Sequence, residues 1–350
     1  MKFLIVGPDN LKDIILFQSL LAQLKRRHAQ CEIDAILPVR YQALALRMPE
    51  VRRALALPEG TGIERMVAIY KLSLLLRKES YYQAIVLPDS FSTALLPMLA
   101  KIHRRTGYSP AVRWWPPVSI VLNDLRQKND HRYTLAVDNM AALAFEPGSY
   151  MPERIAPHLL VRDVDRQCTL EKLALQPLIA PLLIICLGNG GQASSHWPEK
   201  HYATVANARI KEGWQVWLMG EAEDLPVGQE VQRMLGSYAD GVCVNLVGRT
   251  ALLETLDLLS LADAVVSCDS GWLHMAAALN RAVVALYGPA SPRHTPPLTK
   301  HREVLTHASG CAHCFKSACT LGLSLCINYP EPEEVIAALA RLPQPVSLLC

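Results

Sequence analysis

Short apolar runs recur along the whole chain, separated by longer stretches in which apolar and polar residues mix. Runs rich in Val, Ile and Leu are typical of parallel strands that are buried on both faces of a sheet. In the N-terminal half they predict strands at 2–7, 32–37 and 83–87. In the C-terminal half they predict strands at 182–187, 215–219, 242–246, 264–266 and 283–286.

The stretches between these runs carry apolar residues at helical spacing, as from Ile15 to Leu24. They predict a helix that begins at Trp272 and others at 13–28, 40–47, 67–78, 92–100, 133–145, 198–211, 228–235, 252–261 and 331–341. Because strands that alternate with helices form βαβ units, the fold class that we expect is α/β, with doubly wound parallel sheets.

The length of 350 residues and the repetition of this pattern predict two domains. A proline-punctuated stretch from Pro147 through Pro157 leads toward Pro181 and separates the two halves. We place the first domain at 1–170, the second at 171–330 and a C-terminal helix and tail at 331–350. One option for this last segment is that it packs back on the first domain.

The composition narrows the class of protein. A hydrophobic share of 51% and a charged share of 19% exclude a disordered chain, and a formal charge of +3 is too small to indicate a nucleic-acid partner. No apolar run is long enough to cross a bilayer, and the apolar start is cut short by Pro8 and Asp9, which excludes a signal peptide. We therefore expect a cytoplasmic protein without a transmembrane segment.

The stretch 264–297 reads as strand, tight turn, helix, strand and loop. Asp269, Ser270 and Gly271 form the turn, where backbone N–H groups and a helix N-terminus point outward and favour a phosphate. The alternative is an ordinary βαβ crossover, in which Asp269 or Ser270 caps the helix and no ligand binds.

This stretch also carries a specific motif. Asp269, Ser270, Gly271 and His274, with the loop 287–297, closely resemble the donor-binding signature of the ADP-heptose:lipopolysaccharide heptosyltransferases of glycosyltransferase family 9. Further segments at 48–51, 86–91, 105–108 and 122–124 are similar to the heptosyltransferase II branch of that family.

The resemblance implies a GT-B architecture, in which two doubly wound, Rossmann-like domains face a cleft. The N-terminal domain would bind the acceptor and the C-terminal domain the nucleotide sugar. It also implies an ADP-heptose donor, a lipopolysaccharide inner-core acceptor met at the cytoplasmic face of the inner membrane, and inverting transfer without a catalytic cofactor.

Asp13 is the candidate catalytic residue. It follows the loop after the first predicted strand, and the resemblance places it on the family's catalytic aspartate. An inverting transfer needs such a base to take the proton from the acceptor hydroxyl. The alternative is a helix N-cap, although Leu16 lacks the Glu or Gln of a capping box. Lys12 stands where the family usually has Gly.

A glycine-rich run at 188–198 can cradle a phosphate before a helix that starts at a proline. The family usually has a Lys two residues before Trp197, but this chain has Ser195, and a neutral hydroxyl cannot replace a cation beside a leaving diphosphate. His196 or Lys200 would offer compensation. The candidate donor-binding residues in this run are Gly190, Gly191, Ser194, Ser195 and His196.

Three further features carry candidate chemistry. The resemblance makes His274 a donor contact, although a lone helical His is more often structural. Arg104 and Arg105 would meet an anionic acceptor, with an exposed basic loop as the alternative. Four cysteines have the spacing of a tetrahedral zinc or iron site, for which we expect a structural role: Cys311, Cys314, Cys319 and Cys326.

Two functional hypotheses follow from the sequence. In the first, the protein transfers heptose from ADP-heptose to the inner core of lipopolysaccharide, with Asp13 as general base. In the second, it binds a nucleotide sugar or the core but has lost turnover through Ser195. A variant of the first keeps the chemistry and uses another sugar nucleotide.

Overall fold

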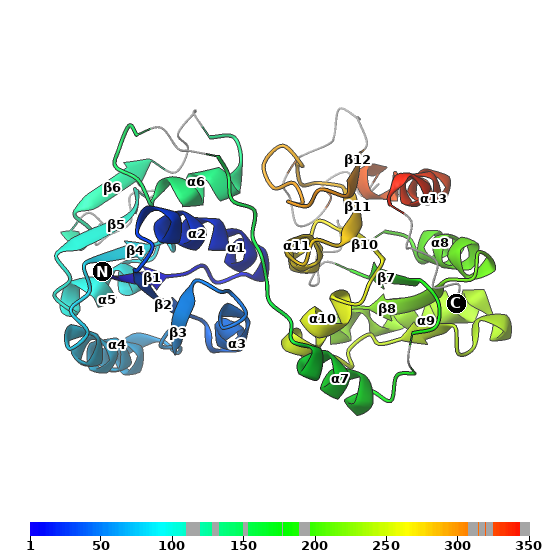
Figure 1. Ribbon diagram of the computed structural model, residues 1–350, viewed down its shortest axis with the longest axis horizontal. Coiled ribbons are helices and arrows are strands. Elements are labelled where there is room, and N and C mark those ends of the chain that lie inside the picture. Colours follow the sequence, from blue (N-terminus) through cyan, green and yellow to red (C-terminus); the bar gives the residue numbers. More distant parts are fainter. Residues whose placement is uncertain are drawn as a thin grey trace. The chain divides into compact units, whose positions relative to one another are not determined.

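A computed structural model describes residues 1–109, 120–127, 133–149, 153–176, 178–188, 197–306, 314, 319 and 325–343. The chain divides into two compact units, Met1–Leu160 and Val161–Cys350. Within the described residues, each unit is built around one six-stranded sheet, and every strand pair is parallel (Figure 1). The predicted α/β class with doubly wound sheets is therefore confirmed.

The first unit contains, in chain order, β1 (Lys2–Val6), α1 (Leu11–Leu16), α2 (Gln18–Arg27), β2 (Glu32–Leu37), α3 (Gln42–Ala45), β3 (Val51–Ala56), α4 (Gly62–Arg77), β4 (Gln83–Val86), α5 (Phe91–Leu99), β5 (Arg104–Ser109), β6 (Asp124–Gln127) and α6 (Ala136–Ala142). Its strand order is β3-β2-β1-β4-β5-β6.

The second unit contains α7 (Asp163–Lys172), β7 (Leu182–Cys186), α8 (Glu199–Lys211), β8 (Gln215–Met219), α9 (Leu225–Leu235), β9 (Cys243–Asn245), α10 (Leu252–Leu259), β10 (Ala264–Cys268), α11 (Gly271–Ala278), β11 (Ala282–Tyr287), β12 (Arg302–Thr306), α12 (Leu325–Asn328) and α13 (Pro332–Arg341). Its strand order is β12-β11-β10-β7-β8-β9.

Both sheets have the strand order of a Rossmann fold. In each, the chain starts at a central strand, moves outward to one edge and then returns to build the other half. The direction reverses between β1 and β4 in the first unit and between β7 and β10 in the second. In open α/β sheets, ligands bind outside the carboxyl ends of the strands at this reversal, which fixes where each unit's site is expected.

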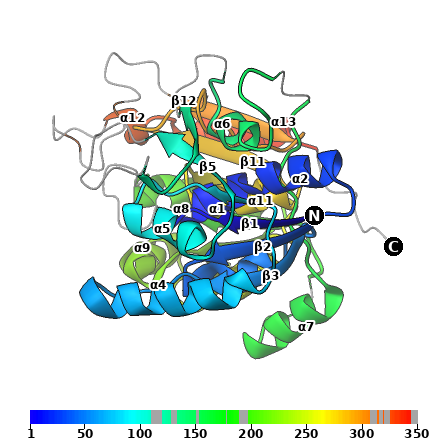
Figure 2. The same cartoon turned by 90° about the vertical axis from the view of Figure 1, so that its left-hand side faces the viewer.

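Helices cover both faces of the first sheet because its central strands are apolar on both sides. Leu4 and Val6 of β1 pack with Ile69 of α4 and Leu96 of α5. In Figure 2, α2 and α4 lie on opposite sides of β1 and β2. The predicted helix at 13–28 is in fact two helices, α1 and α2, which meet at Phe17.

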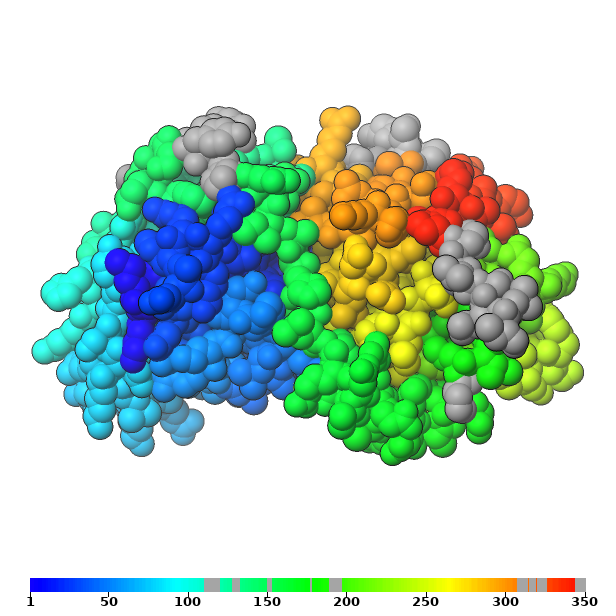
Figure 3. Space-filling view, in the orientation of Figure 1, coloured from blue at the N-terminus to red at the C-terminus, as the bar shows by residue number. Residues whose placement is uncertain are grey.

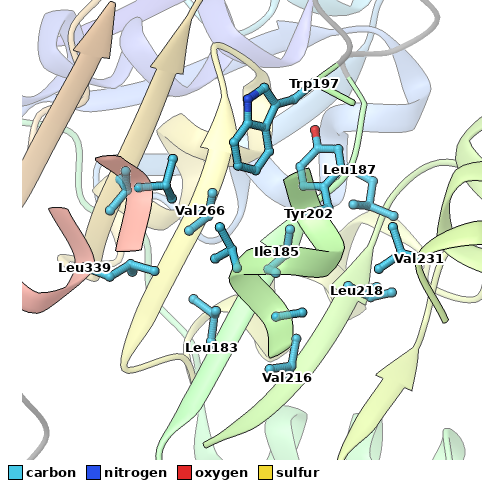
Figure 4. Close-up of a cluster of buried hydrophobic side chains, with 14 of the residues drawn as sticks. Leu183, Ile185, Leu187, Trp197, Tyr202, Val216, Leu218, Val231, Val266 and Leu339 are labelled. Atoms are coloured by element: carbon cyan, nitrogen blue, oxygen red, sulfur yellow. The ribbon is translucent and has the colours of Figure 1, made fainter. Parts of the chain in front are cut away.

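The core of the second unit gathers around β7 and β8. Ile185 and Leu218 lie beneath Trp197 and Tyr202, and Leu339 of α13 belongs to the same cluster (Figure 4). The helix α13 packs against α8, β11 and β12. In Figure 3 its red surface adjoins the orange surface of the segment around β12. The C-terminal helix is thus part of the packed second unit.

The helix α7 begins the second unit. It packs against α10, and Thr169 Oγ1 donates a hydrogen bond to Asp257 Oδ2 at 3.1 Å. Lys172 forms an ion pair with Glu254. The division therefore falls before α7, whereas the boundary expected at residue 170 lies inside this helix. None of the described helices combines the length and the apolar character needed to cross a membrane.

A buried carboxylate joins β2 to β3 in the first unit. Asp34, with no exposed surface, accepts hydrogen bonds from Arg52 Nη2 at 2.6 Å, Arg53 Nη2 at 2.7 Å and the Tyr81 hydroxyl at 2.6 Å. Burial alone would raise the pKa of Asp34, but the bonds from Arg52, Arg53 and Tyr81 outweigh it and hold the pKa at about 2. An ionised Asp34 thus ties β2 to two arginines of β3.

Replacing Asp34 by Asn should lower the free energy of unfolding by about 3 kcal/mol, because two guanidinium groups lose their buried charged partner. The matched control is Glu32→Gln on the same strand, whose side chain is 45% exposed and which should cost less than about 1 kcal/mol. Urea denaturation near neutral pH measures both.

The pH dependence has a defined sign. A lowered pKa in the folded state stabilises the protein above the ordinary aspartate value of 3.8, and this stability is lost as the pH falls toward 2. The difference between wild type and Asp34→Asn should therefore shrink within that window. Equal costs for the Asp34 and Glu32 variants near neutral pH would contradict this role.

Candidate active site

The first unit gathers acidic and aromatic groups at the carboxyl ends of its central strands. Asp13 follows β1, Asp89 follows β4 and Tyr108 lies near the end of β5. Burial raises the pKa of Tyr108, and the charges of Asp89 and Asp13 raise it further. Both carboxylates therefore lie close enough to the Tyr108 phenol to act on it electrostatically. This is the reversal point at which a ligand is expected.

Asp13 lies inside the first turn of α1 and is partly exposed. The N-cap of this helix is Asn10, whose Oδ1 accepts a hydrogen bond from the Asp13 backbone N–H at 2.9 Å. Asn10 Nδ2 also donates to Asp13 Oδ2 at 2.8 Å. The capping role that the sequence left open for Asp13 therefore belongs to Asn10, and a catalytic role for the Asp13 carboxylate stays a prediction.

The second unit also brings residues together at the carboxyl ends of two central strands. These strands, β7 and β10, are neighbours in the sheet. Gly188 follows β7 and Asp269 follows β10. Burial raises the pKa of the Cys268 thiol to about 12, with smaller contributions from the charges of Asp269 and Asp224. These two carboxylates therefore lie near the end of β10, at the reversal point of the second sheet.

The turn after β10 ends in a side-chain cap on α11, the role that the sequence left open for Ser270, and phosphate binding at this turn stays a prediction. Ser270 caps α11, and its Oγ accepts a hydrogen bond from the Leu273 N–H at 3.3 Å. Ser267 Oγ lies 3.1 Å from Ser270 Oγ and holds it in place. The first turn of α11, starting at Gly271, leaves backbone N–H groups at its N-terminus for an anion.

His274 is a buried neighbour of this turn, with an exposed fraction of 1%. Its Nε2 lies 3.4 Å from Asp269 Oδ1. The charge of Asp269 also contributes, after burial, to a raised pKa of Tyr287, so the carboxylate lies near both rings. The imidazole of His274 thus contacts Asp269 from within the core. A direct contact of His274 with a donor stays a prediction.

Gly188 opens the glycine-rich run in a backbone conformation that favours glycine, with φ of +71°. A Cβ atom here would lie 2.0 Å from Asp224 Oδ1. Asp224 is held in turn, because its Oδ2 accepts the Glu221 N–H at 3.0 Å. Asp224 was not among the candidate site residues. A long-range contact of this kind leaves no local signal in the sequence.

Several predicted site residues lie outside the described residues. These are Gly190, Gly191, Ser194, Ser195, His196 and Cys311. Of the other cysteines, Cys314 is exposed, Cys319 partly buried and Cys326 buried. Within the described part of the chain, no group of three or more His, Cys, Asp or Glu residues is arranged to hold a metal ion. The structural metal site stays a prediction.

Arg104 and Arg105 lie at the amino end of β5. Arg104 binds Asp124 and Glu146, with Nη1 at 2.7 Å from Glu146 Oε1. Arg105 Nε donates to the Val121 carbonyl at 2.6 Å. These contacts hold β5 to β6 and to the segment that follows α6. Acceptor binding by the two arginines stays a prediction, but their observed bonds are structural.

Comparisons of the sequence with known proteins identify relatives of this chain. The model of glycosyltransferase family 9 (heptosyltransferase) matches residues 69–324. The chain belongs to glycosyltransferase family 9. It is 39% identical to lipooligosaccharide heptosyltransferase 2 of Haemophilus influenzae over 89% of this chain and 90% of that protein. It is 35% identical to lipopolysaccharide heptosyltransferase 2 of Escherichia coli over 98% of both chains.

A solved structure of a heptosyltransferase is also similar to this chain. The structure of E. coli ADP-heptose lps heptosyltransferase II superimposes with a TM-score of 0.83 at 33% sequence identity, covering 97% of this chain and 98% of that one. This family 9 member is therefore a glycosyltransferase. The family resemblance expected from the segments at 269–274 and 105–108 is confirmed.

Gly188→Ala in this glycosyltransferase should lower stability far more than Gly213→Ala. Both glycines have positive φ, at +71° and +85°, so both substitutions place alanine in a left-handed conformation at a cost of roughly 1 kcal/mol. Nothing lies within 4 Å of a Cβ at Gly213, whereas a Cβ at Gly188 meets the Asp224 carboxylate. The clash should add about 1–3 kcal/mol. Thermal unfolding measures the difference, and equal shifts for the two variants would contradict it.

Proposed function

We propose that the protein transfers a heptose from ADP-heptose to a hydroxyl group of the lipopolysaccharide inner core, with inversion at the anomeric carbon. The observation that carries the proposal is the position of Asp13. Its carboxylate is partly exposed, is bound by the N-cap residue Asn10 and lies at the reversal point of the first sheet. Near full-length similarity to named heptosyltransferases supports the substrate class. The acceptor would be met at the cytoplasmic face of the inner membrane.

The second unit would hold the donor. Backbone N–H groups at the start of α11 and the turn at Asp269 and Ser270 suit a diphosphate, since a helix N-terminus favours negative charge. Asp269 is itself an anion, so it suits hydroxyl groups of the donor better than the phosphates. The glycine-rich run that starts at Gly188 would supply further backbone contacts.

The chemistry follows from this division of roles. Asp13 takes the proton of the acceptor hydroxyl while the hydroxyl oxygen attacks the anomeric carbon. A new glycosidic C–O bond forms as the bond to the diphosphate oxygen breaks, and ADP leaves with the electron pair. Attack opposite the leaving group inverts the configuration. The N–H groups of the donor turn stabilise the charge that develops on the leaving ADP.

Two departures from the family motif give the competing proposal. Lys12 precedes Asp13 where the family usually has Gly, and Ser195 replaces the usual Lys. A chain that lacks this cation would bind the nucleotide sugar and turn it over slowly, or would use another sugar nucleotide. The four-cysteine set from Cys311 to Cys326 is proposed as a structural zinc or iron site, separate from the transfer step.

Asp13→Asn should reduce transfer at least about a hundredfold, because the amide cannot accept the acceptor proton. Binding of ADP, followed by calorimetry, should remain unchanged, since the donor elements belong to the other unit. The control is Asp9→Asn, an exposed carboxylate in the same loop, which should retain activity. ADP release from ADP-heptose and inner-core acceptor is the readout. Full activity of Asp13→Asn would refute the proposed base.

Ser195→Lys tests the competing proposal. If a missing cation limits turnover, the added ammonium group should raise kcat by roughly tenfold, which corresponds to about 1.4 kcal/mol of transition-state stabilisation. Lys200→Ala in the wild-type background shows whether Lys200, two residues after Pro198, already compensates. An unchanged rate in Ser195→Lys, together with a loss in Lys200→Ala, would show that compensation is already present.

A further inference from the structure

Asn10 contacts Asp13 through both atoms of its side-chain amide. Its Oδ1 accepts the Asp13 N–H at 2.9 Å, and its Nδ2 donates to Asp13 Oδ2 at 2.8 Å. The two bonds define the orientation of the amide, because only oxygen can accept from the N–H and only nitrogen can donate to the carboxylate. Capping the helix requires the first bond alone. The second bond is additional, and it acts on the carboxylate.

We infer that Asn10 is a positioning residue for the catalytic carboxylate of Asp13. The inference rests on the proposed function of Asp13 as the base. With Oδ2 bound to Asn10, the carboxylate is fixed about its side-chain torsions, and Oδ1 becomes the oxygen that receives the acceptor proton. A hydrogen bond to a charged group is among the stronger ones that a protein makes, which suits an orienting role.

The surroundings explain why such a bond is needed. Asp13 is partly exposed, and its loop neighbour Asp9 and the nearby Asp89 are both exposed. Asp13 and Asp89 both act on the Tyr108 phenol, so two like charges share this edge of the sheet. A nearby like charge disfavours a second ionised carboxylate at the same edge, so Asp13 benefits from a neutral donor that holds it in place. The amide of Asn10 provides such a donor without adding charge.

The chain's own chemistry provides variants that separate capping from positioning. Asn10→Ser keeps an oxygen that caps α1 but removes the amide N–H group that donates to Oδ2, and its single hydroxyl stands on a shorter side chain. Asn10→Asp also keeps the cap and replaces the donor by a further carboxylate. Asn10→Ala removes both functions. A merely structural role would make Asn10→Ala the worst variant and leave Asn10→Ser close to wild type in every respect.

The experiment measures thermal unfolding, ADP binding, KM for the acceptor and kcat for these three variants. We expect Asn10→Ser and Asn10→Asp to unfold near the wild-type temperature and to bind ADP normally. The kcat should fall about tenfold in Asn10→Ser and further in Asn10→Asp, with KM for the acceptor little changed. A fall in kcat with little change in KM indicates a misoriented base, whereas a loss of folding would also lower the unfolding temperature.

Two outcomes would overturn the inference, and each has a separate meaning. If Asp13→Asn is inactive while Asn10→Ser and Asn10→Asp keep the wild-type kcat, Asp13 is the base and Asn10 serves only as a cap. If Asp13→Asn keeps its activity, the proposed base itself is wrong and the inference about Asn10 fails with it. Wild-type unfolding of Asn10→Ser excludes misfolding as the cause of a lowered kcat.

Discussion

The structure depends on one constraint: parallel strands place all of their carboxyl ends at the same edge of a sheet. In the first unit this edge brings together Asp13 after β1, Asp89 after β4 and Tyr108 of β5. In the second unit it brings together Gly188 after β7 and Asp269 after β10. These groups lie around the points where the strand order reverses, which is where an open α/β sheet is expected to bind a ligand.

The interactions that hold each site are different in kind. In the first unit a neutral amide orients a charged group, since Asn10 caps α1 and also binds the Asp13 carboxylate. In the second unit the Asp224 carboxylate lies against Gly188, in the space that a Cβ atom at this position would need. Away from the sites, the buried Asp34 ties β2 to β3 through two arginines.

The sequence predicted the central strands well because they are buried on both faces and read as apolar runs, as in β7 and β8. It missed β3, β6 and β12, which lie at the edges of their sheets and carry charged residues such as Arg53. It also missed β5, an internal strand that begins with two arginines and therefore does not read as an apolar run. Asp13 was found through a resemblance. The cap at Asn10 was visible as an Asn three residues before an Asp, but Asp224 was not, because its contact with Gly188 is formed only by the fold.

The central claim is that this family 9 glycosyltransferase inverts the anomeric centre of a heptose as it moves from ADP to the lipopolysaccharide inner core. The most direct measurement is the anomeric configuration of the product, determined by NMR after incubation with ADP-heptose and an inner-core acceptor. The account predicts one equivalent of ADP for each transferred heptose and a configuration opposite to that of the donor. Retention of configuration, or ADP release without heptosylated acceptor, would contradict it.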